Sequence, residues 1–232
     1  MRILITCGPA FEPIDGARRL TNMSTGRLGI TLANHFTRKG HEVLCLKGEG
    51  ATDPTPLLTQ SCGPFTTNDD LDLRLSQLAA LQSFDAVYHS AALCDFRVAS
   101  AIGADGTPVR SAKFETRQGQ LTLLLEPAAK ILPRLRAWFP RALIVGWKYE
   151  LAGSRDDAFA RAWNQIDQSD TDACVLNGSA YGQGFAVCER QGRVRECPDL
   201  AALSQELHDH LRISAAGHRV GLTAPSPIAL MA

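Results

Sequence analysis

The chain has 232 residues, with 24 basic and 24 acidic side chains and a hydrophobic fraction of 45%. These values are typical of one large globular domain, or of a domain with an appendage. Runs of basic residues never exceed two, which argues against a nucleic-acid-binding protein, and no apolar stretch is long enough to span a membrane. The chain begins directly with an apolar strand and has no signal-peptide pattern, so we expect a cytoplasmic protein.

Apolar strands alternate with helical segments along the chain. The predicted strands cover 2–7, 42–46, 85–90, 121–125, 142–147 and 172–176, and a hairpin turning at Gln191-Gly192 joins 185–189 to 193–197. The predicted helices cover 26–39, 69–81, 128–138, 155–168 and 199–212. This alternation predicts an α/β fold: a Rossmann-like, doubly wound, mostly parallel sheet over 1–212 with a C-terminal hairpin. Residues 97–120 interrupt the pattern as a glycine-rich flap, and we expect 213–232 to be a disordered tail.

The first strand leads through Gly8 and a long polar loop into a helix that opens on Ser24-Thr25-Gly26. A helix N-terminus presents unpaired N–H groups and a partial positive charge, which suit phosphate oxygens, and hydroxyl side chains there can cap the helix. The glycines do not form the dinucleotide pattern G-x-G-x-x-G, and no Gly-Lys-Ser/Thr of a Walker A loop follows. Two interpretations stay open, a phosphate site and an ordinary capped connection.

Polar residues also follow three later strands of the predicted sheet. Asp95 comes after the strand over 85–90, Lys148 after that over 142–147, and Asn177 after that over 172–176. Because the carboxyl ends of parallel strands share one edge, where ligands of doubly wound sheets bind, we expect these residues to converge there. Lys113 lies in the flap, and by itself a lone lysine is typical of a solvated surface charge.

The seven cysteines are scattered, odd in number and without a C-x-x-C pair, so neither a disulfide framework nor a zinc site is expected. Cys7 and Cys94 lie nearest the predicted sheet edge. Neither has a His or Lys activator beside it in the sequence, so a nucleophilic role for either is the minor alternative.

Seven segments resemble, in order and spacing, phosphopantothenoylcysteine synthetases, the phosphopantothenate–cysteine ligases of coenzyme A biosynthesis. The opening Thr6 to Asp15 is similar to T-x-G-G-T-x-E-P-I-D, and Thr21 to Gly29 is similar to S-N-x-S-S-G-x-x-G. The remaining five segments are Ala91-Ala92-Leu93-Cys94-Asp95-Phe96, Lys113-Phe114-Glu115-Thr116 with Leu121-Thr122-Leu123, Ala129-Lys130-Ile131-Leu132, Gly146-Trp147-Lys148-Tyr149-Glu150, and 172–177. The resemblance covers about residues 2–200.

The resemblance implies a two-step reaction. The carboxylate of 4′-phosphopantothenate attacks the α-phosphate of CTP or ATP, pyrophosphate leaves, and the amine of L-cysteine then displaces the nucleotide from the acyl-nucleotide. Asn22 would stabilise that intermediate, and the flap would bring in Lys113 to neutralise charge and exclude water. The implied nucleotide- and substrate-binding residues are Gly8, Ser24, Thr25, Gly26, Arg27, Ala91, Ala92, Asp95, Phe96, Ala129, Lys130, Ile131, Trp147, Lys148 and Asn177. Also implied are Mg²⁺ held through the nucleotide rather than by protein ligands, a homodimer, and a separate phosphopantothenoylcysteine decarboxylase in the same pathway.

The sequence departs from the family pattern in two places that concern the nucleotide. Pro9 and Ala10 replace a Gly and a Thr of the first loop. The helix over 155–168 lacks the two lysines that CTP-using members offer to the triphosphate, which leaves Lys130, Lys148 and Arg161 as candidates. Two alternatives therefore stay open: a catalytically inactive nucleotide-binding relative, and a short-chain-type NAD(P)-dependent oxidoreductase, although no tyrosine has the lysine four residues later that such enzymes use.

Overall fold

The computed structural model describes residues 1–61, 63–109, 113–115, 117 and 119–220. Its centre is an eight-stranded sheet in the order β12-β11-β10-β9-β6-β1-β4-β5. The parallel strands are β1 (Arg2–Cys7), β4 (Glu42–Lys47), β5 (Gln60–Ser61), β6 (Ala86–His89), β9 (Leu143–Tyr149) and β10 (Ala173–Asn177). The antiparallel hairpin β11 (Phe185–Glu189) and β12 (Val194–Cys197) closes one edge. The predicted Rossmann-like sheet with a C-terminal hairpin is confirmed.

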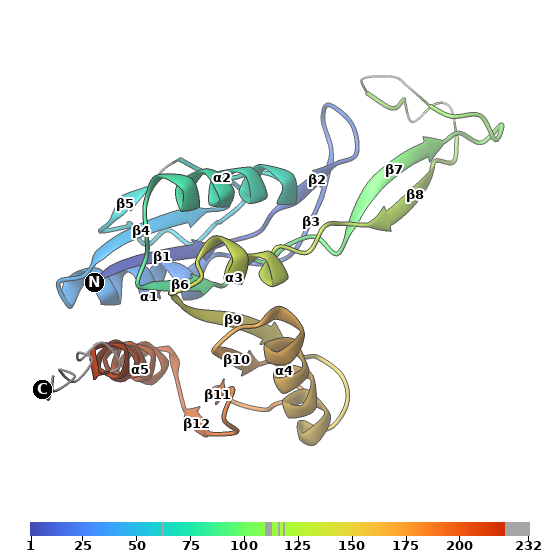
Figure 1. The fold of residues 1–232 in the computed structure, drawn as a ribbon. Coiled ribbons are helices and arrows are strands. Elements are labelled where there is room, and N and C mark those ends of the chain that lie inside the picture. The colour runs from blue at the N-terminus through green and yellow to red at the C-terminus, as the bar shows by residue number, and fades with distance from the viewer. Residues whose placement is uncertain (62, 110–112, 116, 118, 221–232) are drawn as a thin grey trace, which may run out of the picture.

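Helices cover both faces of this sheet (Figure 1). On one face α1 (Arg27–Arg38) and α5 (Leu200–Val220) bury Phe36 and Leu207 against Tyr88 of β6. On the other lie α2 (Asn68–Leu81), α3 (Leu135–Trp138) and α4 (Arg155–Ser169). Successive strand residues serve opposite faces, which explains why the strands read as continuous apolar runs. No helix in the described part of the chain is long and apolar enough to cross a membrane.

An antiparallel arm leaves the sheet after β6. It consists of β7 (Phe96–Ile102) and β8 (Thr122–Pro127), and it projects away from the helices and the sheet (Figure 1). The predicted strand over 121–125 therefore exists as β8, but it pairs in the arm and not in the central sheet. The start of the predicted flap is strand β7, whose small residues and glycine-rich continuation hid the strand pattern.

A second short ribbon precedes α1. Here β2 (Phe11–Pro13) pairs with β3 (Arg19–Thr21), within the segment that the sequence predicts as a polar loop. Two helices also differ from their predicted ranges. The helix expected over 128–138 is only a 3₁₀ turn (Leu132–Arg134) followed by α3, because Pro133 has no N–H group to donate within a helix that began at 128. The last helix continues past 212 to Val220, and residues 221–232 of the expected tail lie outside the described residues.

Candidate functional site

Two glycines join the first strand to the first helix. Gly8 has φ +80° and Gly26 has φ +82°, and a Cβ built on either would lie 2.9 Å from the Cβ of Ala51. The sequence predicts that Ser24 or Thr25 caps the helix, but Gly26 is the N-cap and no side chain caps α1. The two hydroxyls instead accept long hydrogen bonds from the N–H groups of Gly26 (3.4 Å) and Arg27 (3.3 Å). The first turn of α1 therefore keeps N–H groups that an anion could take, with Arg27 exposed beside them.

Asn22 lies at the point where three strands end. Its Nδ2 donates a 2.8 Å hydrogen bond to the carbonyl oxygen of Leu93, which follows β6. The same β6 continuation is bound to the β1 loop, because the N–H of Ala92 donates to Gly8 (2.9 Å) and the N–H of Ala10 donates to Ala92 (3.0 Å). The structure thus brings Asn22, Gly8, Ala91 and Ala92 together at the carboxyl edge of the sheet.

The base of the arm adds a charged pair to this edge. Asp95 forms an ion pair with Lys130, and its carbonyl accepts a 2.9 Å hydrogen bond from the N–H of Ala128. Ala129 is exposed beside this pair, and the ring of Phe96 is 50% exposed at the start of β7. Ile131 does not join them, since its side chain is buried in the core under α2 and α3 and can offer only its backbone.

A second group of charges lies at the ends of β9 and β10. The carboxylate of Glu150 forms ion pairs with Lys148, at 3.4 Å, and with Arg161 of α4, at 2.7 Å. Asn177 is held beside them, because its carbonyl accepts a 2.8 Å hydrogen bond from the N–H of Glu150. Trp147 is half-buried against the α1–α5 core. Since β6 and β9 are neighbours, this group shares the edge that carries Asn22.

Lys113 is exposed in the loop between β7 and β8, and the residue after it is fixed. The N–H of Phe114 donates a 3.0 Å hydrogen bond to Asp15 Oδ2, and the carbonyl of Phe114 accepts a 2.6 Å hydrogen bond from Arg18. Asp15 and Arg18 lie in the turn between β2 and β3, so the arm is bound to the ribbon that leads to Asn22. Asp15 lies inside a motif of the sequence, but its bond to Phe114 cannot be predicted from that motif.

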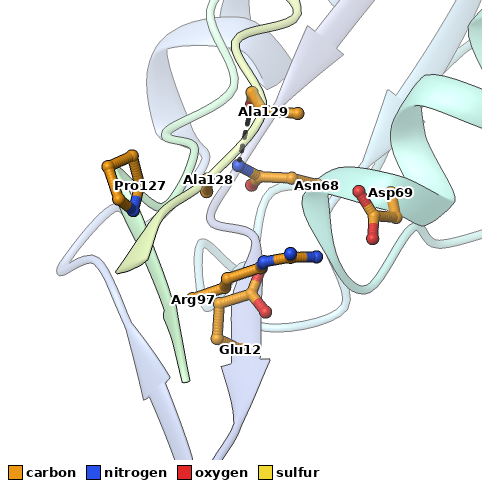
Figure 2. A pocket seen from close by; sticks show the side chains of 7 residues that line it. All are labelled: Glu12, Asn68, Asp69, Arg97, Pro127, Ala128 and Ala129. Carbon is orange, nitrogen blue, oxygen red and sulfur yellow. Dashed lines mark hydrogen bonds between the residues drawn. The ribbon is translucent and has the colours of Figure 1, made fainter. Parts of the chain in front are cut away.

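A cavity of about 300 Å³, which no pattern in the sequence predicts, opens at the root of the arm (Figure 2). Its lining residues are Glu12, Asn68, Asp69, Arg97, Pro127, Ala128 and Ala129. Asn68, at the start of α2, donates to the carbonyl of Cys94 (2.8 Å) and accepts from its N–H (3.1 Å). Burial, and then the charge of Asp69, raise the pKa of Glu12, which Arg97 partly offsets. The helix-start pattern around Thr67 could have indicated the position of Asn68, but not its partner 26 residues later.

The two cysteines nearest this edge are poor nucleophiles. A hydrogen-bonding contact with Cys45, followed by burial, raises the pKa of Cys7 well above its usual value, and burial raises the pKa of Cys94 to about 11. Both thiols therefore stay protonated at neutral pH, which supports the expectation that neither is a nucleophile.

Comparisons with known proteins agree with the fold and the motifs. Residues 1–200 match the family described as "DNA/pantothenate metabolism flavoprotein C-terminal domain". A "Coenzyme A biosynthesis bifunctional protein CoaBC" of Thermococcus kodakarensis is 29% identical over 177 residues, which are 76% of this chain and 41% of that protein. The chain thus spans less than half the length of that relative.

Two solved structures share the fold. A DNA/pantothenate metabolism flavoprotein from Streptococcus pneumoniae superposes with a TM-score of 0.81 and 21% identity over 92% of this chain and 99% of that one. A Cab2 mutant in complex with phosphopantothenate-cysteine gives a TM-score of 0.72 with 18% identity over 94% of this chain and 88% of that one.

Proposed function

The chain belongs to the family of DNA/pantothenate metabolism flavoprotein C-terminal domains, and from this premise we propose that it ligates 4′-phosphopantothenate to L-cysteine in coenzyme A biosynthesis. The observation that carries the proposal is the position of Asn22. Its side-chain amide lies at the carboxyl edge of the sheet, bound to Leu93, beside the glycine junction that opens α1. This is the place where a doubly wound sheet binds its ligands.

The proposed reaction has two displacement steps. The carboxylate oxygen of phosphopantothenate forms a bond to the α-phosphorus of a nucleoside triphosphate, and the bond to pyrophosphate breaks. The amine of cysteine then attacks the acyl carbon of the mixed anhydride, loses a proton, and expels the nucleoside monophosphate. Neither step needs a covalent bond to the protein, so the chain contributes position and charge stabilisation.

Asn22 and Lys113 carry the catalytic roles in this proposal. The amide of Asn22 is held by Leu93 and presents its polar group to the acyl-nucleotide, whose charge changes in both steps. Lys113, next to the buried Phe114, supplies a positive charge to the phosphate or to the developing oxyanion. Ser24, Thr25, Gly26 and the first turn of α1 bind phosphate oxygens.

The triphosphate needs further cations, and the structure offers them in place of the absent helix lysines. Lys148 and Arg161 share the single carboxylate of Glu150, so this group has one positive charge in excess. Lys130 is paired with Asp95. Among the described residues no three His, Cys, Asp or Glu side chains are arranged to hold a metal ion. In the proposed reaction Mg²⁺ would be held mainly by phosphate oxygens of the bound triphosphate, whether CTP or ATP, as it is in most nucleotide enzymes.

We also propose that the protein is a homodimer built on the arm. Three large apolar side chains of the arm are about half exposed: Phe96 (50%), Leu124 (47%) and Leu125 (45%). Phe96 and Leu125 lie on one face of the ribbon and Leu124 on the other, because Leu124 and Leu125 are successive residues of β8. A projecting two-stranded ribbon with exposed apolar side chains on both faces gains stability when a second copy covers them.

The test of the function is pyrophosphate release by purified protein with 4′-phosphopantothenate, L-cysteine and Mg²⁺, with CTP and ATP compared. The expected result is release that requires phosphopantothenate and a preference for one nucleotide. Folded protein that releases no pyrophosphate with either nucleotide would instead favour the inactive nucleotide-binding relative. The observation that favours that second candidate is Gln165 of α4, which donates to the sulfur of Cys174 and offers no charge to a triphosphate.

A further inference from the structure

The peptide of Phe114 is held at both of its polar groups by one pair of residues. Asp15 Oδ2 accepts from its N–H at 3.0 Å, and Arg18 donates to its carbonyl at 2.6 Å. Asp15 and Arg18 are themselves an ion pair at 2.6 Å, and the guanidinium of Arg18 lies 5.7 Å from the centre of the Phe114 ring. Phe114 is 9% exposed, so its side chain is buried by the same contacts.

Asp15 has no capacity left for a substrate. Its side chain is 0% exposed. Oδ1 accepts from the N–H groups of Ala17 (2.9 Å) and Arg18 (2.8 Å), while Oδ2 serves Phe114 and the guanidinium of Arg18. A carboxylate has about four lone-pair sites, and all four are used here. The hydrogen bond from Phe114, followed by those from Ala17 and Arg18, holds the pKa of Asp15 well below its usual value.

These contacts restrict the residue that precedes Phe114. After a turn the chain bonds to β7 again at Val109, whose N–H donates to the carbonyl of Ala101 at 2.9 Å, and it rejoins the arm at Thr122. Lys113 lies between these two points, where the bonds to Phe114 anchor the chain. Because the Phe114 N–H is fixed, the backbone of Lys113 is fixed within one peptide unit.

We propose that Asp15 is a positioning residue of the ligase: it acts through the peptide of Phe114 to fix the place at which the flap presents Lys113. This inference rests on the proposed function for its catalytic consequence. The clamp of Asp15 on Phe114 can be tested without any substrate.

The first test is limited trypsin digestion of Asp15→Asn. Asn keeps an Oδ1 for the N–H groups of Ala17 and Arg18, so the turn of the ribbon is preserved. Its NH₂ group replaces Oδ2 and faces the N–H of Phe114, so a donor meets a donor. Trypsin cleaves after lysine, and the Lys113–Phe114 bond contains the amide that Asp15 binds. We expect that bond to be cut about tenfold faster in Asp15→Asn, as local opening governs proteolysis.

A matched control is Asp105→Asn. Asp105 also binds backbone in the same loop, through the N–H of Thr107 at 3.0 Å, but it makes none of the bonds to Phe114. Cleavage after Lys113 should be unchanged in this variant. Equal cleavage in wild type and Asp15→Asn would overturn the proposal. If Asp15→Asn fails to fold, Arg18→Gln removes the bond to the Phe114 carbonyl and should accelerate the same cut.

The second test is a double-mutant cycle on pyrophosphate release. Asp15→Asn should lower kcat about tenfold in the wild-type background and have little further effect in Lys113→Gln, because both changes act on one lysine. An equal loss in both backgrounds would overturn the link to Lys113. Absence of release from every protein, wild type included, would reject the ligase function, while the proteolysis result would still decide whether the clamp exists.

Discussion

The side-chain amide of Asn22 donates a 2.8 Å hydrogen bond to the carbonyl of Leu93, 71 residues later in the chain. This bond joins the loop before α1 to the segment that follows β6. It sets the orientation of an exposed amide without burying it, which leaves the other polar atom of that amide available to a ligand. The strongest consequences of the proposed function therefore concern this residue.

Asn22→Asp should abolish most of the activity and leave the fold intact. The substitution replaces the donor to Leu93 with a carboxylate oxygen and adds a negative charge where phosphate is proposed to bind. We expect pyrophosphate release to fall by about 10²-fold or more. Because the side chain is exposed, the free energy of unfolding in urea should change by about 1 kcal/mol or less. Ser83→Asp is the control: it adds the same charge before β6, at the opposite edge of the sheet, and should keep full activity. An active Asn22→Asp enzyme would contradict the assignment.

The close approach of Gly26 to Ala51 leads to a prediction about the free energy of unfolding. Gly26→Ala puts a Cβ 2.9 Å from the Cβ of Ala51 and forces alanine into the left-handed region. We expect a loss of about 2 kcal/mol or more in urea unfolding, since the left-handed backbone alone costs about 1–2 kcal/mol. Gly192 has φ +82°, and a Cβ built there would meet no atom within 4 Å. Gly192→Ala should therefore lose only the free energy that the left-handed backbone costs. Ala51→Gly combined with Gly26→Ala should recover the difference between the two. Equal losses in Gly26→Ala and Gly192→Ala would show that the close contact has no energetic weight.

Much of the fold is predictable because the central strands are uninterrupted apolar runs and the helices have clear periodicity. The arm is harder to predict, since Phe96–Ile102 mixes Arg97 and Ser100 with small alanines and lies mostly exposed, away from the core of the sheet. The sequence predicts too short a last helix, because the alanines that follow residue 212 are as compatible with a helix as with a tail.

Residues of the site can be predicted from the sequence only where they lie within short local motifs. The Ser24-Thr25-Gly26 segment and Asn22 stand out in the sequence because glycine and hydroxyl residues cluster around them. Asp15 and Asn68 do not, since their partners lie 99 and 26 residues away and only folding reveals them. Ile131 illustrates the converse: it lies in a motif, yet its side chain is part of the core.

The excess cation at β9 and β10 predicts an effect on nucleotide binding. Lys148→Gln leaves Glu150 with Arg161 alone, which turns a net positive group into a neutral one. We expect the KM for the triphosphate to rise about tenfold, because one charged hydrogen bond contributes about 1.5–3 kcal/mol. The KM for cysteine should stay constant. Lys39→Gln, at the far end of α1, is the matched control. If Lys148→Gln leaves the KM unchanged, the triphosphate lies elsewhere on the sheet edge.

The arm predicts a self-association that one charge can break. Leu124→Glu puts a carboxylate on a side chain that is 47% exposed, so the folded protomer should tolerate it. A dimer interface that buries residue 124 would not tolerate the substitution, because burying the new charge costs free energy. Sedimentation velocity should show a wild-type dimer and a Leu124→Glu monomer. Ser83→Asp should remain dimeric. A wild-type monomer at every concentration would refute the proposed assembly.

His89 makes the stability of the fold depend on pH. It is 6% exposed at the end of β6, with its Nδ1 2.8 Å from Thr6 Oγ1, and burial lowers its pKa from 6.5 to about 4. Its folded form binds protons more weakly than the unfolded chain, so stability is fully present above about pH 6.5 and is lost as the pH falls toward 4. The loss between pH 7 and pH 5 should be about 2 kcal/mol from this residue.

Two further histidines act in the same direction. Burial lowers the pKa of His35 and of His41, which lie against His208 with ring centres 6.0 and 5.3 Å away. The difference between the free energies of unfolding of the wild type in urea at pH 7 and pH 5 therefore measures the combined contribution of His89, His35 and His41. His89→Gln should be less stable at pH 7 but should lose about 2 kcal/mol less than wild type on acidification. A His89→Gln protein with the full wild-type pH dependence would show that the buried imidazole of His89 is not a source of it.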